Sequence, residues 1–245
     1  MDCQQLFSRK TGRIMWENIK HGFYLNFIKE NRYQWLLDGL KTTLEITVFA
    51  VIIGVIIGFI VAIIRSAHDK NGKFRFLNGI CRVYLTVIRG TPTMIQLLIM
   101  NFVIFGSVTV NKIIVGGLAF GINSGAYVAE IVRSGIMSID QGQFEAGRSL
   151  GLNYTQTMTK IILPQAVKNI LPALGNEMIV LLKETSISGY IGLTDLTRGG
   201  DIIRSQTYSA LFPLLAVAAI YLVIVCFLTY LVGRLERRLR TNERK

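Results

Sequence analysis

The chain has 245 residues, 51% of them hydrophobic, and its mean hydropathy of +0.45 is too high for an ordinary soluble domain. Its formal net charge is +12, but the basic residues lie beside the ends of hydrophobic segments. No basic groove with interleaved aromatic residues appears, which argues against a nucleic-acid partner. The sequence therefore predicts an all-α integral membrane protein whose surface contacts the lipid bilayer.

Residues 1–38 form an N-terminal segment that lacks the apolar core of a cleavable signal peptide. Apolar residues recur at helical spacing between Lys20 and Lys29, so we expect an interfacial segment that lies along the membrane instead of crossing it. These residues are Ile19, Phe23, Tyr24, Phe27 and Ile28.

Five hydrophobic segments follow within a transmembrane domain at 39–233, and about 20 apolar residues suffice to cross a bilayer. We expect spans near 40–64, 83–107, 112–135, 165–186 and 208–232. The fourth is the weakest, because Lys168 and Glu177 interrupt it. Small residues at four-residue spacing in the first and third spans predict helix-packing seams. They are Gly54 and Gly58, and Gly117, Gly121, Gly125 and Ala129.

The distribution of basic residues predicts how the chain is oriented. The loop after the first span carries Arg65, Lys70, Lys73, Arg75 and Arg82 against only Asp69, and the tail at 234–245 is also basic. By the positive-inside rule both segments face the cytoplasm. Five spans then place the N-terminus outside and the C-terminus inside, although the basic residues of 1–38 run against an external location.

Little in the sequence indicates chemistry within this chain. Cys3, Cys81 and Cys226 form no sensible disulfide framework, and His21 and His68 are isolated from other metal-ligating residues. The chain has no phosphate-binding loop with the required lysine, so we expect it not to hydrolyse ATP. The prediction is a protein with no metal, no cofactor and no catalytic residues of its own.

The polar loop at 138–164, between the third and fourth spans, predicts a stiff helical hairpin. Two capping boxes start its helices, Gly151 can take the left-handed conformation between them, and Pro164 suits the first turn of the next helix. The boxes are Asp140 with Gln143 and Asn153 with Gln156.

This loop resembles the cytoplasmic coupling motif of ABC importer permease subunits, which reads Glu-Ala-Ala, three residues, Gly, nine residues, Ile, one residue, Leu-Pro. The matching positions are Glu145, Ala146, Gly147, Gly151, Ile161, Leu163 and Pro164, and only Gly147 departs, where the family usually has Ala. The resemblance implies the type I ABC importer permease fold, with five transmembrane helices and cytoplasmic coupling helices. It also implies separate cytoplasmic ATPase subunits that use ATP and Mg. The expected docking residues are Phe144, Glu145, Ala146, Gly147, Gly151, Leu152 and Tyr154.

Two further stretches, Tyr84–Gln96 and Ser124–Ile136, look like the polar amino acid branch of these permeases, of the histidine, glutamine and arginine type. The match extends over most of residues 35–240. It implies a polar amino acid as substrate, an extracytoplasmic solute-binding protein, and a second permease chain as a homodimer or heterodimer. It also implies a bacterial cytoplasmic membrane.

Candidate pathway residues follow from their chemistry. The guanidinium of Arg89 matches a carboxylate with two hydrogen bonds, and Glu184 can attract an ammonium group. The alternatives are that Arg89 pairs structurally or reaches the interface, and that Glu184 braces the bundle. Glu130 and Arg133, three residues apart, are expected to pair with each other. The remaining candidates are Thr91, Asn101 and Asn123, and the alternative for the two asparagines, which is the stronger one, is interhelical hydrogen bonding.

Two other function classes compete with the importer. An ion-coupled secondary amino acid transporter would be favoured by inverted repeats, but no convincing repeat relates the two halves. A membrane enzyme would need a Ser/His/Asp, His-rich or paired-carboxylate constellation, which is lacking. The sequence favours the importer.

Overall fold

The computed structural model describes residues 16–72 and 74–241, and within them every regular element is helical, which confirms the predicted all-α class. The structure does not describe residues 1–15, 73 and 242–245. Cys3, Lys73 and the outer ends of the predicted N-terminal segment and C-terminal tail therefore lie outside the described residues. The elements are η1 (Tyr24–Ile28), η2 (Lys29–Asn31), α2 (Tyr33–Asn71), α3 (Arg75–Gly90), α4 (Thr93–Ile99), η3 (Met100–Ile104), α5 (Lys112–Met137), α6 (Gln141–Ser149), α7 (Tyr154–Thr157), η4 (Met158–Ile162), α8 (Leu163–Glu184), η5 (Thr185–Ile191), α9 (Leu196–Thr207) and α10 (Leu211–Thr241).

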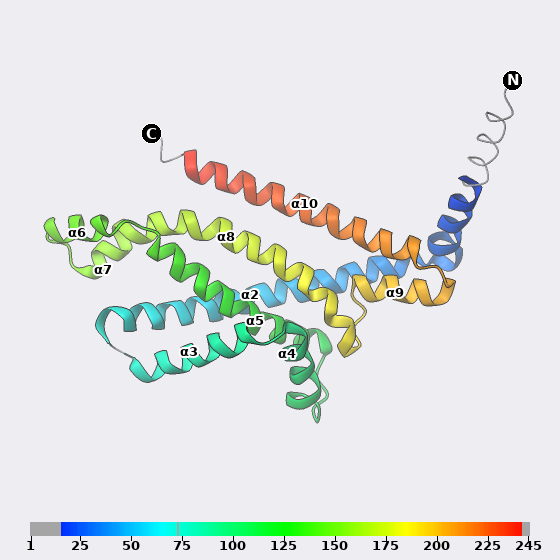
Figure 1. Ribbon diagram of the computed structural model, residues 1–245, viewed down its shortest axis with the longest axis horizontal. Coiled ribbons are helices and arrows are strands. Elements are labelled where there is room, and N and C mark those ends of the chain that lie inside the picture. Colours follow the sequence, from blue (N-terminus) through cyan, green and yellow to red (C-terminus); the bar gives the residue numbers. More distant parts are fainter. Residues whose placement is uncertain (1–15, 73, 242–245) are drawn as a thin grey trace, which may run out of the picture.

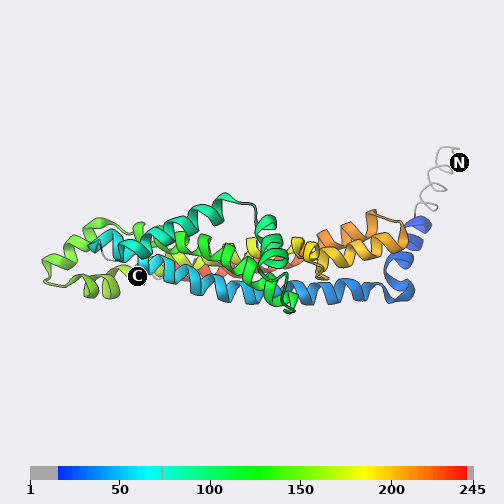
Figure 2. The ribbon, with the colours of Figure 1, turned by 90° about the horizontal axis from the view of Figure 1, so that it is seen from below.

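The molecule is elongated, with α2, α5, α8 and α10 running along its length (Figures 1 and 2). The α6–α7 hairpin lies at one end, together with the turn between α2 and α3 and the last turns of α10. The N-terminal helix at residues 16–23 and α9 lie at the other end. The segments that the positive-inside rule assigns to the cytoplasm therefore gather at a single end.

The predicted packing seams are confirmed where α2 and α5 cross. A Cβ atom added at Gly121 would lie 2.7 Å from Cβ of Ile53, and one at Gly117 would collide with the ring of Phe49. Gly58 of α2 meets α5 in the same way. The two backbones thus approach closely because the stripe carries no side chains.

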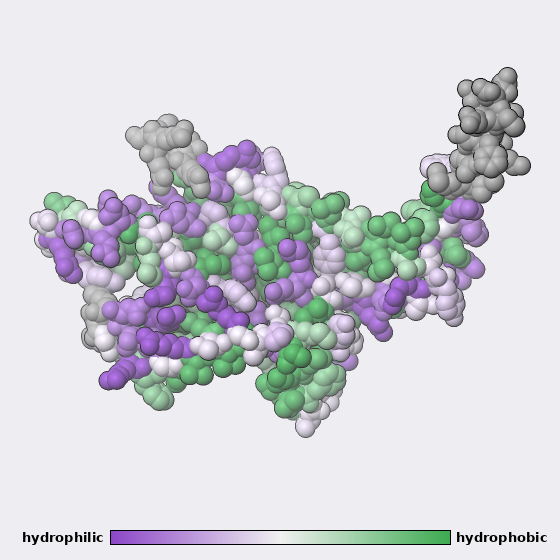
Figure 3. Space-filling view, viewed as in Figure 1, coloured by the Kyte–Doolittle hydropathy of each residue, from purple (hydrophilic) through white to green (hydrophobic). Residues whose placement is uncertain are grey.

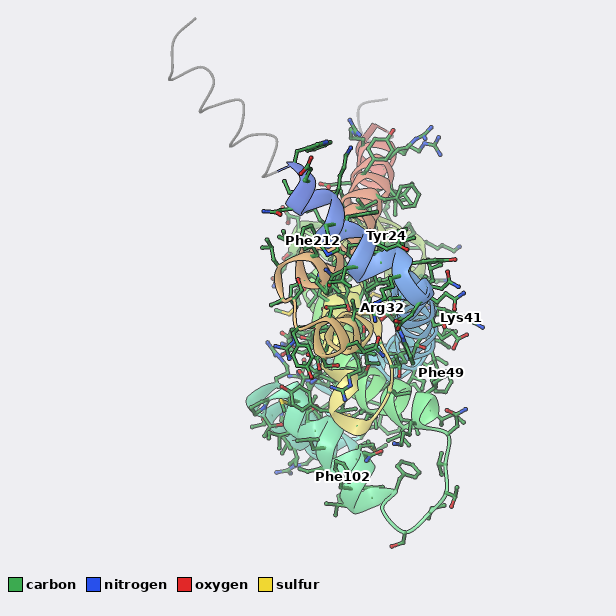
Figure 4. All side chains as sticks on the ribbon, turned by 90° about the vertical axis from the view of Figure 1, so that its right-hand side faces the viewer. Tyr24, Arg32, Lys41, Phe49, Phe102 and Phe212 are labelled. Carbon is green, nitrogen blue, oxygen red and sulfur yellow. The ribbon has the colours of Figure 1, made fainter. Side chains whose placement is uncertain are left out.

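A core forms where α2, α4, α5, α8 and η5 meet. Its fully buried side chains include Ile46, Leu97, Phe120, Leu181 and Ile191. Phe49 of α2 and Phe102 of η3 are labelled in Figure 4, which looks along the molecule from the N-terminal side. This core holds α4, which follows the break after α3, against the long helices.

The span predicted at 83–107 consists of two helices joined by a sharp bend. Helix α3 ends at Gly90, Thr91 and Pro92 are extended, and the axis turns by 110° before α4 and η3 continue. Proline lacks the N–H that a helix needs and disfavours helical angles at the residue before it, so the chain breaks at this point.

Helix length and composition alone support fewer than the five predicted spans. Three described helices are long and apolar enough to cross a membrane, and the bent pair α3 with α4–η3 can add a fourth. Helix α8 covers the predicted segment 165–186, but it does not pass this test. Its charged residues are Lys168, Glu177, Lys183 and Glu184.

The boundary predicted at residue 38 falls inside α2, which begins at Tyr33. The N-terminal helix joins α2 through a bend at Glu30 and Asn31, whose φ angles are 59° and 54°. The guanidinium of Arg32 closes the bend by donating to the carbonyl of Leu25 at 2.7 Å. Tyr24, Arg32 and Phe212 appear near this junction in Figure 4.

The apolar stripe predicted for the N-terminal segment is divided between two environments. Ile19, Phe23, Tyr24 and Ile28 are exposed, as an interfacial helix requires. Phe27 is buried instead, in a cluster with Leu36 and Ile203. The stripe therefore also attaches this segment to α2 and α9. The predicted tail at 234–245 is not separate from the last span, because α10 continues to Thr241.

Candidate functional site

The α6–α7 hairpin begins with a cap that differs from the predicted box. The Asp140 carboxylate accepts a hydrogen bond from the N–H of Gly142 at 2.6 Å. The N–H of Gln143 goes to the Asp140 backbone carbonyl at 3.0 Å. Asp140 is therefore an N-cap, as predicted, but the reciprocal bond from Gln143 is not part of it.

The second capping box is confirmed at the start of α7. The N–H of Gln156 donates to the Asn153 side chain, and the N–H of Asn153 donates to the Gln156 side chain, both at 2.9 Å. Two otherwise unsatisfied N–H groups are thus paired, and a cap of this kind contributes about 1 kcal/mol.

Gly151 turns the chain between the two helices and has the predicted left-handed conformation, with φ of +75°. Its N–H donates to the carbonyl of Arg148 at 2.9 Å, and the N–H of Leu152 donates to that of Gly147 at 3.0 Å. This pair of bonds is a Schellman motif, which satisfies the last carbonyls of α6. The hairpin therefore has ordered hydrogen bonds at both helix ends.

Gly147 is the position where the two arms touch. A Cβ atom at this residue would lie 2.6 Å from Cγ2 of Thr157. Both residues are buried within the hairpin. The glycine at the position where the family usually has Ala thus has a packing reason.

The outer surface of the hairpin carries a cavity of about 310 Å³. The rings of Phe144 and Tyr154 stack across it, with centroids 6.3 Å apart. Burial raises the pKa of the Tyr154 hydroxyl, which keeps it protonated as a hydrogen-bond donor. The lining residues are Gln141, Phe144, Glu145, Arg148, Tyr154 and Thr157.

The predicted docking residues differ in accessibility. Glu145, Ala146 and Gly151 are exposed, whereas Phe144, Leu152 and Tyr154 are half-buried. Gly147 is buried and acts within the hairpin instead of on its surface. The structure therefore offers a charged rim around an apolar floor.

The hairpin continues into α8 without a break. Helix α7, the π-helix η4 and α8 follow one another with helical backbone angles at Met158, Ile162 and Leu163. Pro164 lies in the first turn of α8, as predicted. A force on the hairpin would thus pass along one continuous helical segment into the bundle.

Arg89 lies in the last turn of α3 and belongs to a charged cluster. Its guanidinium is 5.7 Å from the centroid of the Tyr127 ring and 3.7 Å from a carboxylate oxygen of Glu130. The predicted pair of Glu130 and Arg133 is present, also at 3.7 Å. Arg65 of α2 is a third arginine at 3.7 Å from Glu130. We call Arg65, Arg89, Glu130 and Arg133 the Glu130 cluster.

Gln96 joins two of the predicted pathway residues. Its amide N–H groups donate to the Thr91 hydroxyl at 2.8 Å and to the carbonyl of Ile88 at 2.8 Å, and its oxygen accepts from Asn123 at 2.9 Å. These bonds satisfy groups freed by the break after α3. Sequence reasoning missed Gln96, and its place four residues after a proline break is the signal that could have found it.

Glu177 is the second polar residue that sequence reasoning missed. It was read as an interruption of a weak span, but its carboxylate accepts from the Ser124 hydroxyl at 2.9 Å and so links α8 to α5. Glu184 lies two turns further along α8 and is partly buried. Contacts among the described residues place neither Glu184 nor Asn101 in the Glu130 cluster or with Gln96.

Comparison with known sequences gives one family. The family described as binding-protein-dependent transport system inner membrane component matches residues 54–241. The putative glutamine transport system permease protein GlnP of Rickettsia conorii is 38% identical over 210 residues, covering 84% of this chain and 94% of the relative. The arginine transport system permease protein ArtQ of Bacillus subtilis is 39% identical over 210 residues, covering 85% and 94%. The glutamine permease GlnP of Escherichia coli K12 is 37% identical, covering 84% and 93%.

Solved structures agree with these relatives. A crystal structure of an amino acid ABC transporter with histidines has a TM-score of 0.79 and 42% sequence identity, covering 86% of this chain and 98% of the other. The methionine ABC transporter MetNI, in an inward-facing conformation, has a TM-score of 0.69 at 22% identity, which shows the fold alone. These matches favour the type I importer permease over an ion-coupled secondary transporter. The chain therefore belongs to the family of binding-protein-dependent transport system inner membrane components, the permease subunits of ABC importers.

Proposed function

We propose that this permease subunit forms the translocation pathway of an ATP-driven importer for polar amino acids. The names of its glutamine and arginine transport relatives support this substrate class. The arginine-rich Glu130 cluster is compatible with it, because every amino acid carries a carboxylate that a guanidinium can bind with two hydrogen bonds.

The single observation that carries the coupling proposal is the rigid hairpin and its cavity. Phe144 and Tyr154 form an apolar floor, and the exposed Glu145 lies at the rim. A cytoplasmic ATPase subunit, which would bind ATP and Mg in its own chain, can insert a complementary edge there. The continuous segment from α7 to α8 would then transmit closure of the ATPase to the pathway.

The other partners follow from the same arrangement. An extracytoplasmic solute-binding protein would deliver the substrate at the end that carries α9, and a second permease chain, identical or paralogous, would complete the pathway. In a bacterial inner membrane the N-terminus would then lie outside and the C-terminus in the cytoplasm. The gathering of basic ends beside the hairpin supports that orientation.

Within the pathway, Arg89 would hold the substrate carboxylate, and Glu184 would attract its ammonium group or a cationic side chain. Thr91, Asn101 and Asn123 would supply neutral polar contacts. Asn123 supports this assignment, since its side-chain oxygen is buried without a hydrogen-bond partner. Charged groups at membrane depth normally face a bundle interior or a water-filled cavity.

The test is uptake in vesicles that contain the chain, its ATPase and its binding protein. We expect uptake of glutamine or arginine that requires ATP on the side of the membrane where the ATPase lies. This uptake should continue without any ion gradient. Uptake driven by a proton or sodium gradient without ATP would contradict the proposal. Glu145→Lys should reduce coupled uptake while insertion of the chain into the membrane is retained.

A further inference from the structure

The Glu130 cluster has an unusual composition for a structural ion-pair network. Three guanidinium groups, from α2, α3 and α5, surround one carboxylate, and each lies 3.7 Å from an oxygen of Glu130. Asp69 adds a second carboxylate, 3.6 Å from Arg133. The cluster with Asp69 thus keeps one unbalanced positive charge.

The contacts within the cluster are loose. A hydrogen bond between a guanidinium and a carboxylate has a separation of about 2.7–2.9 Å, so contacts of 3.7 Å leave the donors of these arginines largely unused by Glu130. The Nε atom of Arg65 is buried and has no hydrogen-bond partner. Such N–H groups can donate to a better-placed carboxylate, because a buried polar group without a partner is costly.

The cluster is also accessible. The side chains of Arg89 and Glu130 are 44% and 36% exposed, so a solute can reach them without unfolding the bundle. Hydrophilic residues gather over the half of the molecule that contains α3 and the hairpin, whereas the surface over α4 and η3 is hydrophobic (Figure 3). A charged surface on membrane helices has to face protein or water.

We propose that Arg65, Arg89 and Arg133 form a binding station for the carboxylate of the transported solute, and that Glu130 is an internal anion that competes for this station. Glu130 occupies the station when it is empty, yields to an arriving carboxylate, and returns to displace it toward the cytoplasm. This inference rests on the proposed function for the identity of the solute. It assigns to Glu130 a positioning role, since Glu130 acts on the arginines and not on the solute.

The first test measures anion binding directly. Thermal unfolding of the purified full-length chain is followed in sodium acetate and in sodium chloride at equal ionic strength, with acetate as the carboxylate probe. Glu130→Gln removes the tethered competitor, whose effective concentration is in the millimolar range or above. We expect acetate to stabilise this variant more than it stabilises the wild type, with an acetate affinity about tenfold tighter. An acetate response equal to that of the wild type would overturn the proposal.

The second test measures transport by the complete complex. Glu130→Gln should lower the KM for the imported amino acid by about tenfold and should also lower kcat, because release is slower. A brace without a role in binding would instead lower assembly and leave KM unchanged. The matched control is Glu45→Gln, which removes an exposed carboxylate that lies 3.9 Å from Lys41 on α2, outside the Glu130 cluster. It should change neither KM nor the acetate response.

A conservative variant keeps the tests decisive if Glu130→Gln does not assemble. Glu130→Asp retains the charge but withdraws the carboxylate by one methylene, so it should shift KM and acetate affinity in the same direction by a smaller factor. Unchanged or weaker binding of both ligands in this variant would refute the competition. If the wild-type complex shows no ATP-driven uptake of amino acids, the proposed function is refuted but the binding station is not. The acetate measurement tests the station separately, because it does not depend on transport.

Discussion

Gly151 shows how far the hairpin depends on a single backbone angle. Its φ of +75° costs nothing for glycine, but the left-handed region costs other L-residues roughly 1–2 kcal/mol. The same residue donates one of the two hydrogen bonds that end α6. The glycine is thus required by conformation, and not by lack of space, because nothing lies within 4 Å of a Cβ atom at this position.

We therefore predict that Gly151→Ala weakens the hairpin by about 1–2 kcal/mol and that Gly151→Pro, which also loses the N–H, disrupts it. Co-purification of the ATPase subunit and the ratio of transport to ATP hydrolysis are the measurements. Gly79→Ala is the matched control, since Gly79 lies in α3 with ordinary angles and open space. A Gly151→Pro complex with full ATPase retention and full transport would refute the coupling assignment.

At the residue scale the sequence predicted local backbone features better than side-chain partners. Gly151 and the Asn153 box depend on neighbours within a few residues, and both are confirmed. The partners of Arg89, which are Tyr127 and Glu130, come from α5, at distances in sequence that a local pattern does not encode. Gln96 was also missed, because its hydrogen bonds depend on a backbone carbonyl that only the break leaves free.

At the scale of elements, the contact between α2 and α5 organises the bundle. Its glycine stripe was readable from four-residue spacing alone, because that spacing places small residues on one helix face. Pro92 and its disfavoured helical neighbour indicate the break between α3 and α4 from local sequence alone. The turn of 110° could not be predicted in this way, since an apolar segment can turn within a protein as well as cross a membrane.

Gly121→Ala should destabilise the chain by about 1–3 kcal/mol, because its Cβ atom would lie 2.7 Å from that of Ile53 and would force α2 away from α5. The thermal unfolding midpoint of the purified chain measures this effect. Gly116→Ala on the same helix is the control, since its nearest neighbour would be Leu193 at an ordinary 3.5 Å. Equal midpoints for the two variants would show that the seam tolerates a wider separation.

Gln96→Ala should cost about 1–3 kcal/mol, because it leaves the buried amide of Asn123 and the carbonyl of Ile88 without their partner. Gln165→Ala, which loses only a bond to the carbonyl of Ile161 in its own helical segment, should cost less. Urea unfolding of both variants provides the comparison. A smaller loss at residue 96 than at residue 165 would contradict the role of Gln96 as the link across the break.

At the scale of the whole molecule, the two ends differ in charge and in structure. One end holds the hairpin and the basic segments, and the other holds α9 and the N-terminal helix (Figure 1). The basic residues predicted that the hairpin and the basic segments share one side of the membrane, and in the structure these segments lie at one end. Helix length and composition alone support up to four spans, one fewer than the five predicted. Helix α8 is a predicted span that this test omits, and its Glu177 is hydrogen-bonded to Ser124 of α5, which hydropathy along one chain does not register.

Single cysteines in a cysteine-free chain test the orientation. Gln143→Cys, exposed on α6, should react with an impermeant maleimide only after the cells are opened. Tyr190→Cys, which replaces a side chain that is 63% exposed near α9, should react in intact cells once any outer membrane is permeabilised. The reverse labelling pattern would invert the proposed topology.

The contact between Gly147 and Thr157 predicts that these two positions, ten residues apart, vary together among relatives. Because a Cβ atom at 147 would lie 2.6 Å from the methyl group of Thr157, an alanine there is compatible only with a smaller residue at 157. A protein that gains alanine at 147 while it keeps threonine at 157 therefore has a strained hairpin. Relatives with alanine at the first position are therefore expected to carry a residue smaller than threonine at the second.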